Sequence, residues 1–103
     1  MTQAKRSRAE ADDWTIGNAD EFLGLSADES TYIEIKLALA GLLVERRKAA
    51  SLTQALLAPQ VKTSQSRLAR MEHADATMSI DILVRTLLST GESRQDIARV
   101  IAA

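Results

Sequence analysis

The chain has 103 residues, of which 46% are hydrophobic and 3% aromatic, and its formal net charge is −1. This length predicts one domain plus tails, its Leu, Ala and Ile content favours an all-α fold, and the absence of cysteine excludes disulfides and thiolate metal sites. Its longest apolar run is too short to span a bilayer and no signal peptide is visible, so we expect a cytoplasmic protein with no membrane partner.

The chain begins with residues 1–13, which are polar and show no periodicity, so we predict a disordered tail. Residues 14–103 are predicted to form a single helical domain. At its start, Asn18 can cap a short helical turn over 19–23, which Gly24 then ends.

The longest predicted helix runs from Ala27 to Arg47 or Lys48. Ser26 and Glu29 have the spacing of a capping box, which opens a helix. Apolar side chains form two stripes along it, so more than one face should be buried. The stripes are Ile35, Leu39, Leu42 and Leu43, and Ile33, Leu37 and Val44. We expect the first to pack on the domain core, and the second to be covered by residues 14–23 or by a second subunit.

Two short helical patterns follow, with a tight break between them. The first opens at Thr53 and the second at Ser64, a good N-cap residue. Two short helices joined by a turn of three or four residues form a helix-turn-helix, whose second helix can enter the major groove of DNA. The apolar positions of the pair are Leu56, Leu57, Val61, Leu68 and Met71.

Two further helices are predicted near the C-terminus. Ser79 can cap a helix over Ile80–Ser89 that Gly91 closes, and Ser93 with Asp96 opens another over 94–101. The whole pattern predicts a bundle of five main helices. The last two are our candidates for a dimer surface.

The stretch 52–72, LTQALLAPQVKTSQSRLARME, resembles the phage-repressor (Cro and lambda-type, or XRE) family of DNA-binding domains. The resemblance implies a five-helix, lambda-repressor-like domain with an N-terminal extension and a helix-turn-helix at 52–73, in which the helix 65–73 reads the major groove. Residues 14–39 resemble, less specifically, the extension of a bacterial subgroup that includes HigA-type antitoxins. The matching residues are Leu52-Thr53-Gln54, Leu57-Ala58, Ser64-Gln65-Ser66, Leu68, Arg70 and Glu72.

Two residues depart from the family pattern. The family usually has Gly in the turn where this chain has Lys62, and a lysine held at positive φ costs about 1–2 kcal/mol. Pro59 falls inside the first helix of the pair, and because it lacks a backbone donor it should bend or end that helix near Ala58.

Charge is distributed unevenly along the chain. Between Arg46 and Met71 there are six cations and no acid, whereas between Ala9 and Ile35 there are eight acids and no Lys or Arg. The basic block coincides with the helix-turn-helix, and a locally basic face supplies phosphate affinity even on a nearly neutral protein. The alternative is that both blocks are ordinary solvated faces.

On a helical wheel of the second helix, Leu68 and Met71 face the core, so Ser66 and Arg70 lie on the opposite face. Gln65 stands at the exposed start, and Arg67 lies on a flank suited to a phosphate. Gln pairs with adenine and Arg with guanine, although such residues are also common on any solvated helix face. Gln54 resembles the family's phosphate-contacting Gln. The full predicted DNA-binding set is Thr53, Gln54, Lys62, Ser64, Gln65, Ser66, Arg67 and Arg70.

Other chemistry has little support in the sequence. His73 is the only histidine and has no partners at metal-ligand spacing, so we expect a surface residue and no metal. No phosphate-cradling Gly loop or nucleophile motif is present, so we expect no cofactor and no enzymatic activity. Glu72 should have a structural role, pairing with a nearby Arg.

The sequence therefore predicts a sequence-specific regulator of transcription, a repressor that binds double-stranded operator DNA as a homodimer. The alternative is an antitoxin whose acidic residues 9–34 cover a basic toxin protein and which autoregulates its own operon. The two functions can coexist in one chain.

Overall fold

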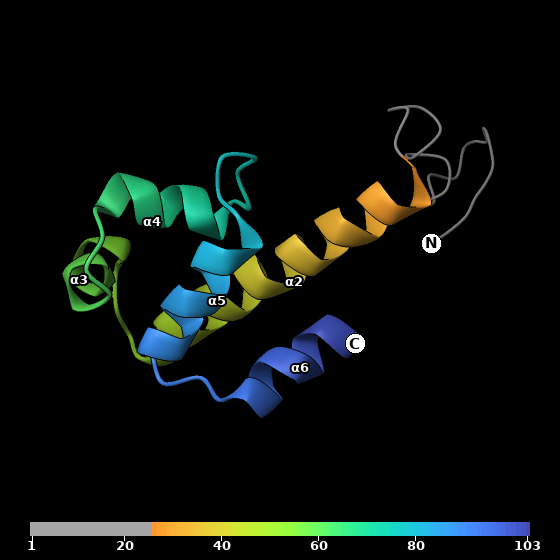
Figure 1. Cartoon of the computed structure of the whole chain (residues 1–103). Coiled ribbons are helices and arrows are strands. Elements are labelled where there is room, and N and C mark those ends of the chain that lie inside the picture. The colour runs from red at the N-terminus through yellow and green to blue at the C-terminus, as the bar shows by residue number, and fades with distance from the viewer. Residues whose placement is uncertain (1–25) are drawn as a thin grey trace, which may run out of the picture. The chain divides into compact units, whose positions relative to one another are not determined.

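A computed structural model describes residues 26–103, and all the regular secondary structure in that range is α-helical (Figure 1). The helices are α2 (Ala27–Ala49), α3 (Gln54–Gln60), α4 (Gln65–Glu72), α5 (Ile80–Ser89) and α6 (Arg94–Ala102). The predicted all-α class is confirmed over this range. The predicted tail over 1–13, the Asn18 cap and the turn at 19–23 lie outside the described residues.

The chain divides into two compact units, Met1–Glu34 and Ile35–Ala103. In the first unit, the start of α2 carries the predicted capping box. Ser26 Oγ accepts a hydrogen bond from the Glu29 amide at 3.1 Å, and Glu29 Oε1 accepts one from the Ser26 amide at 3.0 Å. This reciprocal pair satisfies two donors that the first helical turn leaves open.

Four helices of the second unit begin at an N-cap residue that carries a hydroxyl group, and each of these residues was predicted as a cap. The side chain of each cap accepts a hydrogen bond from the backbone N–H three residues later, and such a cap contributes about 1 kcal/mol. The caps are Thr53, Ser64, Ser79 and Ser93. These contacts explain why the helix starts could be located from sequence.

The core of the second unit is built from aliphatic and methionine side chains. It contains one predicted stripe of α2, the inner face of the α3–α4 pair and the inner sides of α5 and α6. Its buried members are Leu39, Leu42, Leu43, Leu57, Ala58, Leu68, Met71, Met78, Leu83, Leu87 and Ile97. Figure 1 shows α4 and α6 on opposite sides of α5 and of residues 35–49 in α2.

Several apolar positions of the predicted pattern are exposed instead. Ile33 and Leu37 in the second stripe of α2 are exposed, as are Leu56, Leu88 and Ile101. In α3 the side that faces the core holds Leu57 and Ala58, so Leu56 lies on the outer side. No helix within residues 26–103 has both the length and the apolar character needed to cross a membrane.

We expected Pro59 to bend or end α3 near Ala58. The helix continues past Ala58 to Gln60, so Pro59 lies in its last turn. There the missing N–H removes one bond, to the Ala55 carbonyl, and both residues are exposed, so water can satisfy that carbonyl. The proline is tolerated because it stands so close to the helix end.

Three helices end in the left-handed conformation without glycine. The residues that follow α2, α3 and α4 are Ser51, Lys62 and Ala74, with φ of 58°, 61° and 52°. After α3, the Thr63 amide donates to the Ala58 carbonyl at 2.9 Å and the Lys62 amide to the Pro59 carbonyl at 3.1 Å. These two hydrogen bonds satisfy carbonyl groups at the end of the helix, but the positive φ that they require strains a residue that carries a Cβ atom.

Lys62→Gly should therefore stabilise the protein by about 1 kcal/mol, which raises the melting temperature by about 4–8 °C in a domain of this size. Thermal unfolding followed by circular dichroism measures it. Lys62→Ala is the matched control, because it removes the charge and keeps the strain, so it should bring no such gain. A glycine variant that melts at or below the wild-type temperature would contradict the strain argument.

Candidate nucleic-acid interface

Helix α4 has two faces of opposite character. Leu68 and Met71 are buried in the core, as predicted. Gln65, Ser66 and Arg70 are exposed, and no helix of the second unit covers them. The helix N-cap, Ser64, uses its hydroxyl to accept from the Arg67 amide at 3.1 Å, and that hydroxyl lies 3.3 Å from the Ser66 hydroxyl.

Among the residues that the structure describes, the three cations beside and on α4 make no polar contact inside the protein, as is also true of Lys48 and Arg94. Within residues 26–103, the side chains of Lys62, Arg67 and Arg70 form no ion pair or hydrogen bond, and all three are exposed. Four of the five other described arginines each pair with a carboxylate, namely Arg46, Arg47, Arg85 and Arg99, whereas Arg94 does not. The guanidinium donors of α4 are therefore available to an external acceptor such as a base edge or a phosphate.

A polar network lies beneath the exposed face and joins three helices. Arg47 at the end of α2 makes a bidentate contact with Glu72 at the end of α4, with Nε–Oε2 at 2.7 Å and Nη2–Oε1 at 3.0 Å. Arg47 Nη1 also donates to the Leu52 carbonyl at 3.0 Å. The predicted pairing of Glu72 with an arginine is confirmed.

Both ends of this ion pair are largely removed from water, with 15% of the Arg47 side chain and 5% of the Glu72 side chain exposed. Burial by itself raises the pKa of the Glu72 carboxyl. The hydrogen bonds from Arg47 and Gln54, together with the nearby positive charge, outweigh burial and hold that pKa below its ordinary value. The same hydrogen bond raises the pKa of Arg47, so the pair stays ionised.

Gln54 is the first residue of α3, and its side chain belongs to this network. It is half-buried, and its Nε2 donates to Glu72 Oε1 at 2.9 Å. Because an ionised carboxylate only accepts, the amide nitrogen must face Glu72. One N–H of Gln54 remains for an external acceptor. The neighbouring Thr53 is exposed and uses its hydroxyl to accept from the Leu56 amide at 3.2 Å.

A hollow of about 460 Å³ opens beside α4, between the 61–64 turn and α5; we call it the α4–α5 hollow. Its lining includes Lys62 and Arg67, with Met71 and Ile82 as apolar surface and Thr63 and Thr86 as polar neighbours. Among the described residues, none of those that line it is acidic. The two cations were predicted as DNA-binding residues, whereas the two threonines and Ile82 were not. The only sequence signal for Thr86 is its spacing of three from the apolar Leu83.

The loop that follows α4 is held by polar contacts that the sequence did not reveal. Lys36 of α2 is buried and donates from Nζ to the Asp75 carbonyl at 3.3 Å. The Asp75 carboxylate accepts from the amide and hydroxyl of Thr77, at 2.8 and 2.6 Å, and these bonds lower its pKa. His73 is exposed next to this loop, as predicted. Over residues 26–103 no three His, Asp or Glu side chains are grouped to hold a metal ion.

Comparisons with known proteins identify no relative of this chain. No family model matches it, and neither does any curated protein or any solved structure.

Proposed function

We propose that the chain is a sequence-specific DNA-binding regulator, a repressor that inserts α4 into the major groove. The observation that carries this proposal is the outer face of α4, where exposed Gln65, Ser66 and Arg70 have no covering helix. A helix with its side chains is about 10–12 Å across, and the major groove is about 12 Å wide. Gln65 and Arg70 have the donors that suit adenine and guanine edges.

The α3–α4 pair gives this proposal its architecture. Two short helices with a turn at 61–64 match the helix-turn-helix pattern, and the five described helices are compatible with a lambda-repressor-like domain. In this arrangement α3 lies across the backbone, so that the remaining N–H of Gln54 is offered to a phosphate. Such a regulator would act in the cytoplasm.

A homodimer on a palindromic operator follows from the small number of bases that one α4 can reach. Two copies related by two-fold symmetry would place half-sites about 34 Å apart, or a multiple of that. The exposed Leu88 on α5 and Ile101 on α6 keep these two helices as candidates for the dimer surface. Repression would follow from occlusion of a promoter, with no catalytic step.

Titration of the purified protein against its own upstream DNA tests the function directly. The titration is run with random DNA as competitor and at several salt concentrations, because phosphate contacts make affinity depend on salt. We expect tight, salt-dependent binding that survives the competitor. Absence of binding at low salt would contradict the proposal, and binding abolished by the competitor would leave only a basic surface.

Arg70→Ala should weaken binding to the operator by about 1–3 kcal/mol while leaving binding to random DNA nearly unchanged, because a base contact contributes only to the correct sequence. Competition titrations on both DNAs measure the difference. Arg94→Ala is the control, since Arg94 is an exposed cation on α6, on the far side of α5 from α4. Equal losses on both DNAs would make Arg70 a phosphate contact instead.

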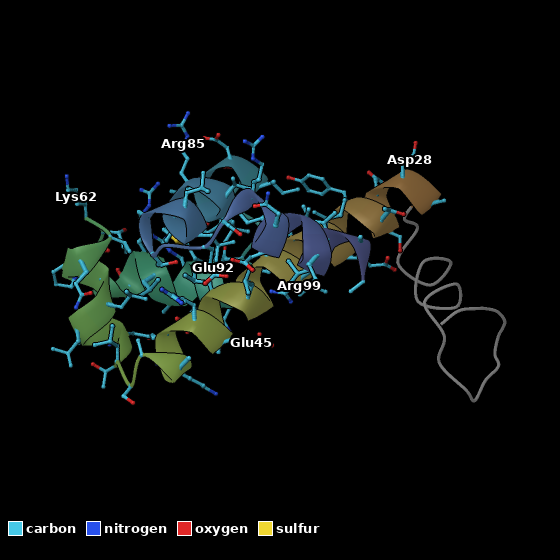
Figure 2. All side chains as sticks on the ribbon, turned by 90° about the horizontal axis from the view of Figure 1, so that it is seen from below. Asp28, Glu45, Lys62, Arg85, Glu92 and Arg99 are labelled. Atoms are coloured by element: carbon cyan, nitrogen blue, oxygen red, sulfur yellow. The ribbon has the colours of Figure 1, made fainter. Side chains whose placement is uncertain are left out.

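A second candidate function, that of an antitoxin, has its own observation in the first unit. There Tyr32 and Ile33 are exposed beside the exposed acids Asp28 and Glu29, and Figure 2 shows Asp28 extending away from α2. Acidic and apolar side chains together suit a basic partner protein. A small basic open reading frame beside this gene, whose product co-purifies with the wild type but not with Ile33→Asp, would support it; the absence of a stable complex would contradict it.

A further inference from the structure

The α4–α5 hollow combines features of an anion site. Lys62 and Arg67 stand at its edge without an internal partner, and Figure 2 shows Lys62 extending away from the ribbon. Met71 and Ile82 add apolar side chains to its lining. The hollow thus has two uncommitted positive groups, with no carboxylate in its lining to compensate them.

Thr63 adds an independent observation. It lines the hollow, and its Oγ1 is buried without a hydrogen-bond partner in the range 26–103. A buried hydroxyl without a partner costs about 1–3 kcal/mol. On the opposite side, Thr86 donates only to the sulfur of Met71, at 3.5 Å, which is a weak acceptor. The Thr63 hydroxyl therefore has donor capacity that the protein itself does not use, whereas the single O–H of Thr86 is already donated to Met71.

The position of the hollow on α4 indicates what reaches it. At 100° per residue, Ser66 and Arg70 mark the outer face and Arg67 lies on one flank, next to the buried Met71. Glu72, with its Gln54 partner, lies on the other flank. A helix in the major groove has one phosphate backbone along each flank. The flank of Gln54 and the flank of the hollow must then face different strands.

The backbone strain at Lys62 fits the same picture. Glycine would relieve a φ of 61°, yet the turn carries the long cation that reaches the edge of the hollow.

From these features we infer that the α4–α5 hollow is a phosphate seat, which receives one backbone phosphate of the DNA strand on the α5 side of α4. Arg67 and Lys62 supply the charge. Thr63 and Thr86 border the seat. Gln54 contacts the other strand. This inference rests on the proposed DNA-binding function and adds to it which strand is held by which residues.

The test is a phosphate scan of the operator with single methylphosphonates, each of which removes one negative charge. One substitution should weaken wild-type binding about tenfold and have almost no further effect on Arg67→Ala. In Lys62→Gly, the same methylphosphonate should also have little further effect on binding. Because this variant should melt at a higher temperature than the wild type, its weaker binding cannot be due to loss of folding. The methylphosphonate that has no further effect on Gln54→Ala should lie on the opposite strand. In the control Arg94→Ala, each methylphosphonate should weaken binding as much as it does in the wild type.

Variant affinities give a second measurement. Arg67→Ala and Lys62→Gly should each weaken binding to operator and random DNA by the same factor, and each should reduce the slope of log K against log salt by about 1. If the wild type binds the operator normally but no single methylphosphonate loses its effect in Arg67→Ala, the phosphate-seat inference is wrong and the proposed DNA-binding function is unaffected. If the wild type binds no operator, the proposed function itself fails.

Free phosphate is the other source of the same chemistry. Titration of inorganic phosphate into the protein alone, followed by the backbone amide signals of Thr63 and Arg67, shows whether the hollow takes a small anion. Phosphate-induced changes in these amide signals that disappear when operator DNA is bound would support the phosphate-seat inference. Shifts that persist with operator bound would overturn it, because the hollow would then lie away from the DNA.

Discussion

Leu68→Asp should leave the second unit unfolded at 25 °C. The Leu68 side chain is 0% exposed at the centre of the core, so the substitution removes its apolar contacts and places an unpaired carboxylate there. The cost is several kcal/mol, comparable to the total stability of about 5–15 kcal/mol that a domain possesses. Far-UV circular dichroism at 25 °C and a thermal scan measure the loss of helix.

Leu56→Asp is the matched control for this variant. It makes the same chemical change on the neighbouring helix, but Leu56 is 57% exposed, so stability should change by no more than about 0.5 kcal/mol. If Leu68→Asp melted at the wild-type temperature, the inner face of α4 would have been assigned incorrectly, and with it the outer face proposed to read DNA.

Glu72→Ala should destabilise the protein by about 3 kcal/mol. It leaves the largely buried guanidinium of Arg47 without its carboxylate and Gln54 without its acceptor, and removal of one partner from a buried pair costs about 3–5 kcal/mol. Urea denaturation gives the free energy of unfolding. Asp81→Ala is the control: the Asp81–Arg85 pair is 72% and 77% exposed, so its loss should cost about 1 kcal/mol or less.

The same pair makes stability depend on pH in a defined direction. Because the pKa of Glu72 is lower in the folded protein than in the unfolded chain, its contribution is fully present above the unfolded pKa and is lost as pH falls through the folded pKa. Wild-type stability should therefore fall below about pH 4. Asp75 and Asp96 also have lowered pKa values and act in the same direction, so the informative quantity is the difference between wild type and Glu72→Ala. That difference should shrink at low pH; a constant difference would show that the ion pair does not titrate.

The helix starts and the inner face of α4 could be predicted because their causes are local. Ser64 and Ser79 cap helices through contacts that span three residues, and Leu68 and Met71 are related by one helical turn. The outer positions of Ser66 and Arg70 follow from the same periodicity. For the two faces of α4, the spacing of residues in the sequence is enough to predict which side chains point inward and which point outward.

The remaining features depend on residues far apart in the chain. Arg47 meets Glu72 across 25 positions and Lys36 meets the Asp75 carbonyl across 39, so no local pattern could specify either contact. Exposure of Leu37 and Leu56 could not be predicted either, because periodicity identifies apolar faces and not how many of them another helix covers. The α4–α5 hollow required α4 and α5 to be brought together first.

The left-handed helix ends give this chain a way to gain stability without any change in the proposed DNA-reading surface of α4. Ser51 and Ala74 stand outside the proposed contacts, and glycine at each should release strain of about 1 kcal/mol, additively because they terminate different helices. Most substitutions destabilise by a similar amount. A lineage that acquired these glycines could accept an unfavourable new residue on α4 and remain folded. Under the proposed function, a change of operator preference on α4 is then easier to accept after stabilising substitutions at positions that do not contact DNA.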